Sequence, residues 1–417
     1  MTKPFTPTRY HDGVAERLLR STALKIELPP SQHRLACERK AAVEAHLQRP
    51  ASPLRFLVAL FYQQGSMAIG ATIRAKHRED GYDIDIVVEL RLGRDTPPDR
   101  ALDLLYQAVR EEPGSRYYDM VERQTRCVTI RYADGMHLDL TPSILVQAVP
   151  PRGSLIFHAK PEEPRHMDRR IRMNSYAFVN AFNEACPADT VFALDYGRMA
   201  RLNDRALVNE AESEEVPAHS STVGAKSVTV VALQLIKRFR VLRYRARTGR
   251  MPPSVMLSCF ALEAARPGRL IAEALVETAN HIHRRLKAAQ AAGELIDLRN
   301  PRDREDRFTD RWPATLNDQA TFIADLEWFA RKLAVLLDET RPLRERGDAL
   351  EALFGEGPGR AALDETMDAL GRDGPVIEHK AATLHATPPL ASPRIAPAKP
   401  VSGRANTFYG PGKWRGA

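Results

Sequence analysis

Short segments in the first 150 residues are either strongly apolar or alternate apolar with polar positions, which is typical of β-strands. Apolar residues at helical spacing predict a helix over residues 33–48, before the first strand, and a proline start predicts another helix over residues 98–110. The predicted strands cover residues 55–62, 83–92, 125–132 and 136–141. The last two should form a hairpin that turns at Ala133-Asp134-Gly135.

After residue 150 the pattern changes, because long segments with helical spacing replace the strands. The predicted helices cover residues 174–185, 221–248, 254–265, 270–292, 320–339 and 348–370. From residue 372 the chain is rich in proline and alanine and cannot bury enough apolar surface to fold. We therefore expect the chain to end in a flexible tail.

These patterns predict an α+β fold in which a small sheet is followed by a helical domain that closes a cleft. Four parts are expected along the chain. They are an N-terminal helical segment that packs on the core (1–50), the core with the sheet (51–172), the helical domain (173–371) and the tail (372–417).

Composition narrows the class of protein. Of the 417 residues, 43% are hydrophobic and 27% are charged, and no apolar run approaches the roughly 20 residues that span a bilayer. The four cysteines are scattered without metal-ligand spacing, so we expect a reducing, cytoplasmic location without disulfides. The net charge of +8 favours polyanionic partners such as nucleotides or nucleic acid, although part of this charge lies in the tail.

Carboxylates stand out in the strand over residues 83–92. Because side chains alternate between faces with a period of two, Asp83 and Asp85 share one face. Asp139, flanked by apolar residues in a later strand, would supply a third carboxylate. Glu89 and Asp134 are expected to be surface or turn residues rather than metal ligands.

Three converging carboxylates suit Mg²⁺, a hard cation that prefers oxygen ligands. Nucleotidyl transfer uses two such ions, which bind a triphosphate and lower the pKa of the attacking hydroxyl. We therefore predict two Mg²⁺ ions, with Mn²⁺ as a substitute, held by the three aspartates. Gly65 and Ser66 follow the first strand and precede a short predicted helix over residues 68–73, where backbone N–H groups and the Ser66 hydroxyl could bind phosphate.

The order of strand, Gly-Ser, Asp-x-Asp strand and third aspartate resembles the DNA polymerase β superfamily of nucleotidyltransferases. The sequence is further similar to the bacterial cGAS/DncV-like nucleotidyltransferases (CD-NTases). Residues 173–185 resemble the Asn-Pro-x-x-Tyr helix of that family, with Ser175 in place of the proline. Residues 231–243 resemble its basic spine helix, and residues 252–262 resemble the helix after it.

The resemblance implies an enzyme that joins nucleoside triphosphates into cyclic or linear oligonucleotides, which act as second messengers in bacterial anti-phage signalling. Ser66 would bind the donor triphosphate, together with Lys226 and Lys237 of the spine helix. The alternative for these lysines, and for Arg238, is a solvated basic face. Ser254 would contact phosphate or cap its own helix.

Other side chains could reach the same site. His137 shares a strand face with Asp139, and the sequence does not decide which of Arg123, Arg126 and Arg131 flanks the acceptor nucleotide. Trp312, Trp328, Phe322 and Phe329 have the spacing of core residues.

Two other functions remain open at this point: a terminal nucleotidyltransferase that acts on an RNA or protein acceptor, and an inactive nucleotide or RNA sensor. Three intact carboxylates argue against the sensor. The tail, which ends in Gly416-Ala417, is a candidate tether for a regulatory or modifying protein.

Overall fold

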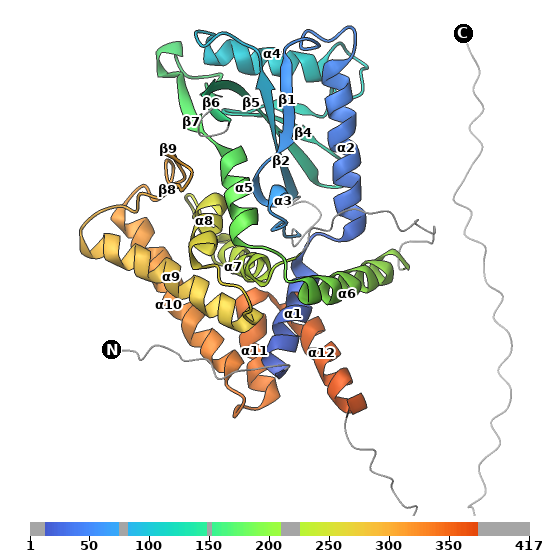
Figure 1. Cartoon of the computed structure of the whole chain (residues 1–417), viewed down its shortest axis with the longest axis vertical. Coiled ribbons are helices and arrows are strands. Elements are labelled where there is room, and N and C mark those ends of the chain that lie inside the picture. Colours follow the sequence, from blue (N-terminus) through green and yellow to red (C-terminus); the bar gives the residue numbers. More distant parts are fainter. Residues whose placement is uncertain (1–12, 75–81, 148–151, 210–225, 374–417) are drawn as a thin grey trace, which may run out of the picture. The chain divides into compact units, whose positions relative to one another are not determined.

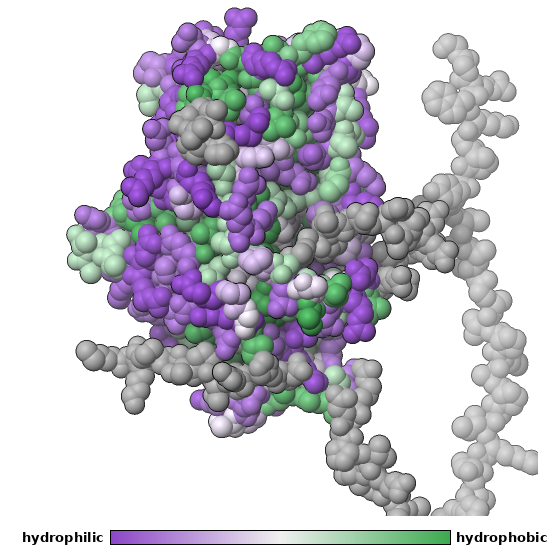
Figure 2. Space-filling model, in the orientation of Figure 1, coloured by the Kyte–Doolittle hydropathy of each residue, from purple (hydrophilic) through white to green (hydrophobic). Residues whose placement is uncertain are grey.

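The computed structural model describes residues 13–74, 82–147, 152–209 and 226–373. The predicted tail beyond residue 373 and the first residues of the helix predicted from residue 221 lie outside this part of the chain. Within the described ranges, no helix is both long enough and apolar enough to cross a membrane. Hydrophilic residues dominate the visible face, with smaller apolar areas between them (Figure 2).

A seven-stranded mixed sheet forms the first half of the fold (Figure 1). Five strands lie in the order β1-β2-β5-β4-β3, β6 pairs with the end of β5, and β7 pairs with β6. The strands are β1 (Val58–Gln63), β2 (Tyr82–Leu90), β3 (Val121–Arg123), β4 (Val128–Arg131), β5 (Met136–Gln147), β6 (Gly153–His158) and β7 (Arg169–Met173). The predicted hairpin is confirmed, since β4 and β5 pair antiparallel and Gly135 has the positive φ of 88° that its turn requires.

Two helices, α2 (Pro30–Gln48) and α4 (Pro98–Arg110), cover one face of the sheet. Their apolar side chains share a buried cluster with alternate residues of β2, including Ile84, Ile86 and Val88. This packing fixes the direction of β2, because the residues between these positions must then point to the opposite face. Asp83 and Asp85 therefore face away from α2 and α4.

The second half is helical, as the sequence predicts, and shares one large apolar core with α1. Its centre is α7, in which every residue from 229 to 240 is buried. The helices are α1 (Val14–Ile26), α5 (Ser175–Ala185), α6 (Thr190–Asn209), α7 (Val228–Tyr244), α8 (Ser254–Ala264), α9 (Ile271–Ala291), α10 (Leu316–Leu337), α11 (Leu343–Phe354) and α12 (Glu356–Asp373). Trp312, Phe322 and Phe329 are buried in this core, which confirms their predicted role.

Some expected boundaries are wrong. The helix predicted over residues 348–370 is two helices, because Gly355 has a φ of 102° and breaks the chain direction between α11 and α12. The short helix expected at residues 68–73 is instead α3 (Gly65–Ala68), which ends before Gly70, another residue with positive φ. Both glycines have a positive φ, so a right-handed α-helix cannot continue through them.

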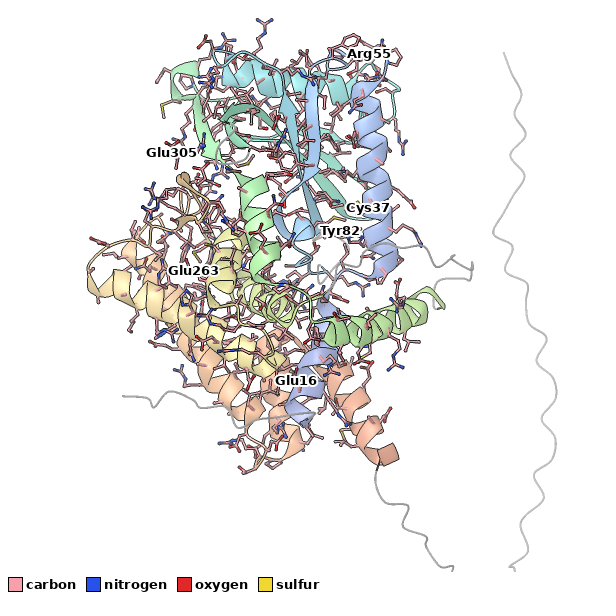
Figure 3. All side chains as sticks on the ribbon, viewed as in Figure 1. Glu16, Cys37, Arg55, Tyr82, Glu263 and Glu305 are labelled. Carbon is pink, nitrogen blue, oxygen red and sulfur yellow. The ribbon has the colours of Figure 1, made fainter. Side chains whose placement is uncertain are left out.

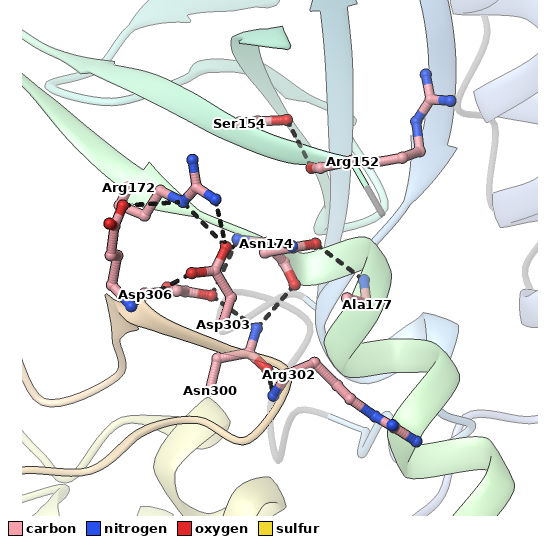
Figure 4. Close-up of polar contacts among 10 residues, drawn as sticks. Arg152, Ser154, Arg172, Asn174, Ala177, Asn300, Arg302, Asp303 and Asp306 are labelled. Carbon is pink, nitrogen blue, oxygen red and sulfur yellow. Dashed lines mark hydrogen bonds and ion pairs between the residues drawn. The ribbon is translucent and has the colours of Figure 1, made fainter. Parts of the chain in front are cut away.

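A polar joint connects the end of the sheet to a small hairpin of β8 (Arg299–Asn300) and β9 (Asp303–Arg307) (Figure 4). The Asp303 carboxylate accepts hydrogen bonds from Arg172 Nε at 2.9 Å and Asn174 Nδ2 at 3.2 Å. The Asp306 carboxylate accepts from the Asn174 backbone N–H at 3.0 Å and from Asn300 Nδ2 at 2.9 Å. Because both aspartates are buried, these donors compensate for the water that the carboxylates lose. Burial still raises the pKa of Asp306 to about 6.

A second long-range contact joins α1 to the bundle. Glu16, on α1 (Figure 3), is buried and accepts hydrogen bonds from the backbone N–H groups of Ile271 at 2.8 Å and Ala272 at 3.1 Å. These two N–H groups open α9 and have no partner inside that helix. Glu16 thus supplies a cap for α9 from a residue far away in the chain.

We predict that Glu16→Ala lowers the free energy of unfolding by about 1–3 kcal/mol, because two buried N–H groups lose their acceptor. Glu16→Gln keeps one acceptor oxygen and should lose less. Urea denaturation followed by circular dichroism measures both variants. Equal midpoints for wild type and Glu16→Ala would contradict this role of the carboxylate.

Candidate active site

The candidate site begins with the pairing of β2 and β5. These strands are parallel and in register, so Asp85 lies directly opposite Asp139, and Asp83 lies opposite His137. Residues opposite each other in a sheet point to the same face. The structure thus brings the three predicted carboxylates together on the face that α2 and α4 leave open.

The carboxylates differ in their surroundings. The side chain of Asp83 is 64% exposed and lies 3.4 Å from His137 Nδ1. Asp139 is partly buried and accepts a hydrogen bond of 2.5 Å from the Thr129 hydroxyl on β4. Burial, followed by the negative charges of Asp139 and Asp83, raises the pKa of Asp85 to about 7.

Gly65 lies against Asp85, and the contact explains why this position is a glycine. A Cβ atom at Gly65 would come within 2.1 Å of Asp85 Oδ2, and the φ of +62° is itself unfavourable for other residues. The backbone N–H of Gln64 also donates to the Asp85 carbonyl at 2.9 Å. The turn that carries Ser66 is therefore held directly beside the carboxylates.

Two cavities meet at these residues. The larger, of about 820 Å³, lies between the sheet and α7–α8 and is lined by Gly65, Ser66, Asp83 and Asp85 among others. The smaller, of about 340 Å³, is lined by Asp83 and Asp139 on one side and by arginines on another. Asp83 thus lines both cavities. A ligand in either cavity would therefore lie beside Asp83.

The structure separates the three arginines that the sequence left equivalent. Arg126 lines both cavities, and Arg131 lines the smaller one. Arg123 instead contacts Asp103 and the Ala159 carbonyl and lines neither cavity.

Thr129 and Arg311 also line the smaller cavity, and sequence reasoning missed both. The alternation of residues 128–131 could have placed Thr129 on the Asp139 face. Arg311 carries no local signal, because it lies in the irregular segment between β9 and α10.

The cations predicted to bind triphosphate are buried rather than solvated. Lys226 is 8% exposed, Lys237 is 4% exposed and Arg238 is 3% exposed, so the alternative of a solvated basic face is wrong. Lys237 lines the larger cavity, whereas Lys226 lines neither. Both amines donate to backbone carbonyls of the segment after α3. Burial, with a smaller contribution from Arg240, lowers the pKa of Lys237 to about 7.

Two further expectations change. Ser254 does not cap its helix, since it is the first residue of α8 and its hydroxyl accepts a hydrogen bond from Arg240 Nη1 at 3.0 Å. It does line the larger cavity. Glu89 is not a surface residue: it is 3% exposed and forms an ion pair with Arg152 at 2.7 Å. The strand face of the aspartates therefore continues into a buried region.

The chemistry of the carboxylates suits divalent cations. Carboxylate oxygens are the ligands that Mg²⁺ prefers. Burial and, after it, the negative charges of Asp139 and Asp83 raise the pKa of Asp85, and a bound cation would favour its ionised form. Within the described ranges, no group of three His, Cys, Asp or Glu side chains already closes around one point. Asp83 nevertheless lines both cavities, Asp85 lines the larger one, and Asp139 lines the smaller one.

Comparison with known proteins gives the family. Residues 59–142 match the family described as cyclic GMP-AMP synthase DncV-like, nucleotidyltransferase domain. A cyclic dinucleotide synthase, CdnG of Bradyrhizobium diazoefficiens, is 39% identical over 95% of this chain and 94% of its own length. The chain belongs to the CD-NTase family. It is a metal-dependent nucleotidyltransferase of the class that makes cyclic oligonucleotides.

Solved structures of CD-NTases agree with the fold. The structure of B. diazoefficiens CdnG in complex with GTP is 40% identical and matches with a TM-score of 0.71, over 83% of this chain and 97% of that chain. Vibrio cholerae DncV, a cyclic AMP-GMP synthase, is 12% identical and matches with a TM-score of 0.51, over 82% of this chain and 96% of its own. The second match shows the fold alone. Both confirm the predicted α+β class.

His158 lies beside Arg126, one of the arginines that line the smaller cavity. Arg126 Nε donates to His158 Nδ1 at 3.0 Å, and Arg126 also binds the Asp310 carboxylate at 2.7 Å. Partial burial, followed by the charges of Arg126, Arg169 and Arg311, lowers the pKa of His158 to about 4. A neutral imidazole is the form that can accept this hydrogen bond.

We predict that the His158 resonances titrate near pH 4 in an NMR experiment on this CD-NTase. Because the folded pKa lies below the unfolded value of about 6.5, His158 stabilises the fold above pH 6.5 or so, and this contribution is lost as pH falls toward 4. Arg126→Gln removes one positive charge and should raise the midpoint. A wild-type midpoint at the ordinary value would contradict the combined effect of burial and of the arginine charges on the pKa of His158.

Proposed function

We propose that this enzyme joins two nucleoside triphosphates, at least one of them GTP, into a cyclic dinucleotide. The observation that carries the proposal is the register of β2 and β5, with Asp85 opposite Asp139 and two cavities that share Asp83. GTP is supported by the 39% identical relative, a cyclic dinucleotide synthase whose structure was solved with GTP.

In this proposal Asp83 and Asp85 would bind two Mg²⁺ ions, and Asp139 would bind the one that lowers the pKa of the attacking hydroxyl. When bound, the ions supply charge for the triphosphate and a lowered pKa for that hydroxyl. The Thr129 hydroxyl keeps the Asp139 carboxylate in one orientation. Ser66 donates its hydroxyl to a phosphoryl oxygen of the donor in the larger cavity.

The reaction follows from the two cavities. A ribose hydroxyl of the acceptor, in the smaller cavity, attacks the α-phosphorus of the donor and forms a new P–O bond. The bond between the α-phosphorus and the oxygen that bridges to the β-phosphate breaks, and pyrophosphate leaves with that oxygen, while the hydroxyl proton passes to solvent. Arg126 and Arg131 compensate for the charge of the acceptor phosphates. A second transfer at the same carboxylates closes the ring and releases a second pyrophosphate. Each transfer loses one proton from the attacking hydroxyl.

We expect purified protein with Mg²⁺ and GTP, alone or paired with each other NTP, to form a phosphatase-resistant product that mass spectrometry identifies as a cyclic dinucleotide. Asp85→Asn or Asp139→Asn should lower the rate at least about a hundredfold, because a charged group at the reacting centre is lost. Asp134→Asn is the matched control, since this turn aspartate binds Arg39 outside both cavities.

The control should keep the wild-type rate. Wild-type turnover in Asp85→Asn would overturn the mechanism. Product that appears only when an RNA or protein acceptor is added, and never with NTPs alone, would replace the synthase by a terminal transferase.

We also propose that the product is a second messenger in anti-phage defence, as the family resemblance implies. Bacteria that express the wild-type enzyme should show fewer phage plaques than bacteria that express Asp85→Asn. Equal plaque counts in both strains would count against this role.

A further inference from the structure

Three consecutive backbone carbonyls in the segment after α3 accept hydrogen bonds from side chains of α7 and the chain just before it. The pairs are Lys226 Nζ with Gly70 O at 3.0 Å, Lys237 Nζ with Ala71 O at 2.8 Å, and Gln234 Nε2 with Thr72 O at 2.8 Å. We call these three side chains the carbonyl clamp. Residues 70–72 belong to no helix or strand, so their carbonyls need partners from elsewhere.

The clamp is formed in the interior of the protein. Gln234 is fully buried, and the two lysines are less than one-tenth exposed. A buried ammonium group loses its hydration and needs other partners, so the lysines are held firmly on the carbonyls. Lys226 and Gln234 line neither cavity, which separates their role from that of a substrate contact.

The clamped segment bonds directly to Ser66. The Ala71 N–H donates to the Ser66 carbonyl at 2.8 Å, and the Thr72 hydroxyl lies 3.4 Å from the Ser66 hydroxyl. A shift of residues 70–72 would therefore move both the backbone and the side chain of Ser66.

Lys226, one member of the carbonyl clamp, is held in place by contacts with the end of α1. Lys226 forms an ion pair of 2.8 Å with Glu27, whose carboxylate also accepts from Tyr196 on α6 at 3.3 Å. The Arg74 N–H donates to the Ile26 carbonyl at 2.6 Å, and Glu27 forms a β-bridge with Ile73. Residues 70–74, which follow the helix that carries Ser66, are thus held between α1 and α7 (Figure 1).

We propose that Lys226 and Gln234 are positioning residues, which hold residues 70–72 so that the Ser66 hydroxyl is aimed at the donor triphosphate. The proposal deepens the proposed function, because it rests on Ser66 as a donor contact. It gives Lys226 a different role from direct phosphate binding. Lys237 is both a member of the carbonyl clamp and a candidate phosphate contact, since it lines the larger cavity as well.

The test compares Gln234→Met with Gln319→Met. Both changes replace a fully buried glutamine that donates to a loop carbonyl, but Gln319, on α10, donates to the Glu294 carbonyl at 3.1 Å, and none of its side-chain hydrogen bonds within the described chain reaches residues 70–72. Gln234→Met should raise the KM for NTP about tenfold with kcat changed less than about twofold, which is the mark of lost binding in ground and transition state alike. Gln319→Met should keep the wild-type KM.

Amide hydrogen exchange gives a readout that does not depend on turnover. In free protein, Gln234→Met should speed exchange in a peptide over residues 64–74 about tenfold, and Gln319→Met should not. If the wild type made no product, this readout would still decide whether the clamp orders the Ser66 segment. Unchanged exchange in Gln234→Met, or equal changes of exchange and KM in both variants, would overturn the proposal.

A second pair guards against a variant that fails to fold. Lys226→Arg keeps a cation for Glu27 and donors for the Gly70 carbonyl, whereas Lys226→Met keeps neither. KM and exchange should stay within about twofold of wild type in the arginine variant and rise about tenfold in the methionine variant. An arginine variant that is as impaired as the methionine variant would count against the clamp.

Discussion

Electrostatic repulsion between carboxylates on paired strands is the constraint on which this structure depends. The in-register pairing of β2 and β5 places Asp85 opposite Asp139, and Asp83 follows on the same face. Burial, followed by the negative charges of Asp139 and Asp83, raises the pKa of Asp85 to about 7, so the ionised carboxylate is disfavoured in the folded protein. The apolar face of the same strands, packed under α2 and α4, offsets this cost and holds the register. The apolar packing on one face of the sheet thus offsets the free-energy cost of the carboxylates on the other face.

The surroundings of the carboxylates are organised from the helical half. Lysine and glutamine side chains of α7 bind the carbonyls beside Ser66, and the buried joint of Asp303 and Asp306 ties the β8–β9 hairpin to the start of α5. Buried charges are costly unless hydrogen bonds compensate for lost water. In both places donors and acceptors come from distant segments, so the polar groups are satisfied only when the two halves are folded together.

The two cavities meet at the aspartates, and this arrangement suits an enzyme that must form two bonds in succession. A cyclic product needs at least two transfers, and a donor and an acceptor in the two cavities would both lie beside Asp83. Arg126 lies between the cavities and also bonds to Asp310, after β9. It therefore links the sheet to the helical half at the place where two nucleotides would meet.

The sequence by itself determined the features that depend on local periodicity. The alternation at residues 83–92 predicted that Asp83 and Asp85 share a face, the Pro98 start predicted α4, and the order of motifs predicted the family. It missed α1, α6, β6, β7 and the β8–β9 hairpin. It also allowed a solvated face for Lys226 and Arg238 and predicted a surface position for Glu89, although all three side chains are buried. Only the tertiary structure decided which cavity each residue lines and what each buried charge binds, because those partners lie far apart in the chain. A period of two or 3.6 residues reports the face on which a side chain lies, but it carries no information about what packs against that face.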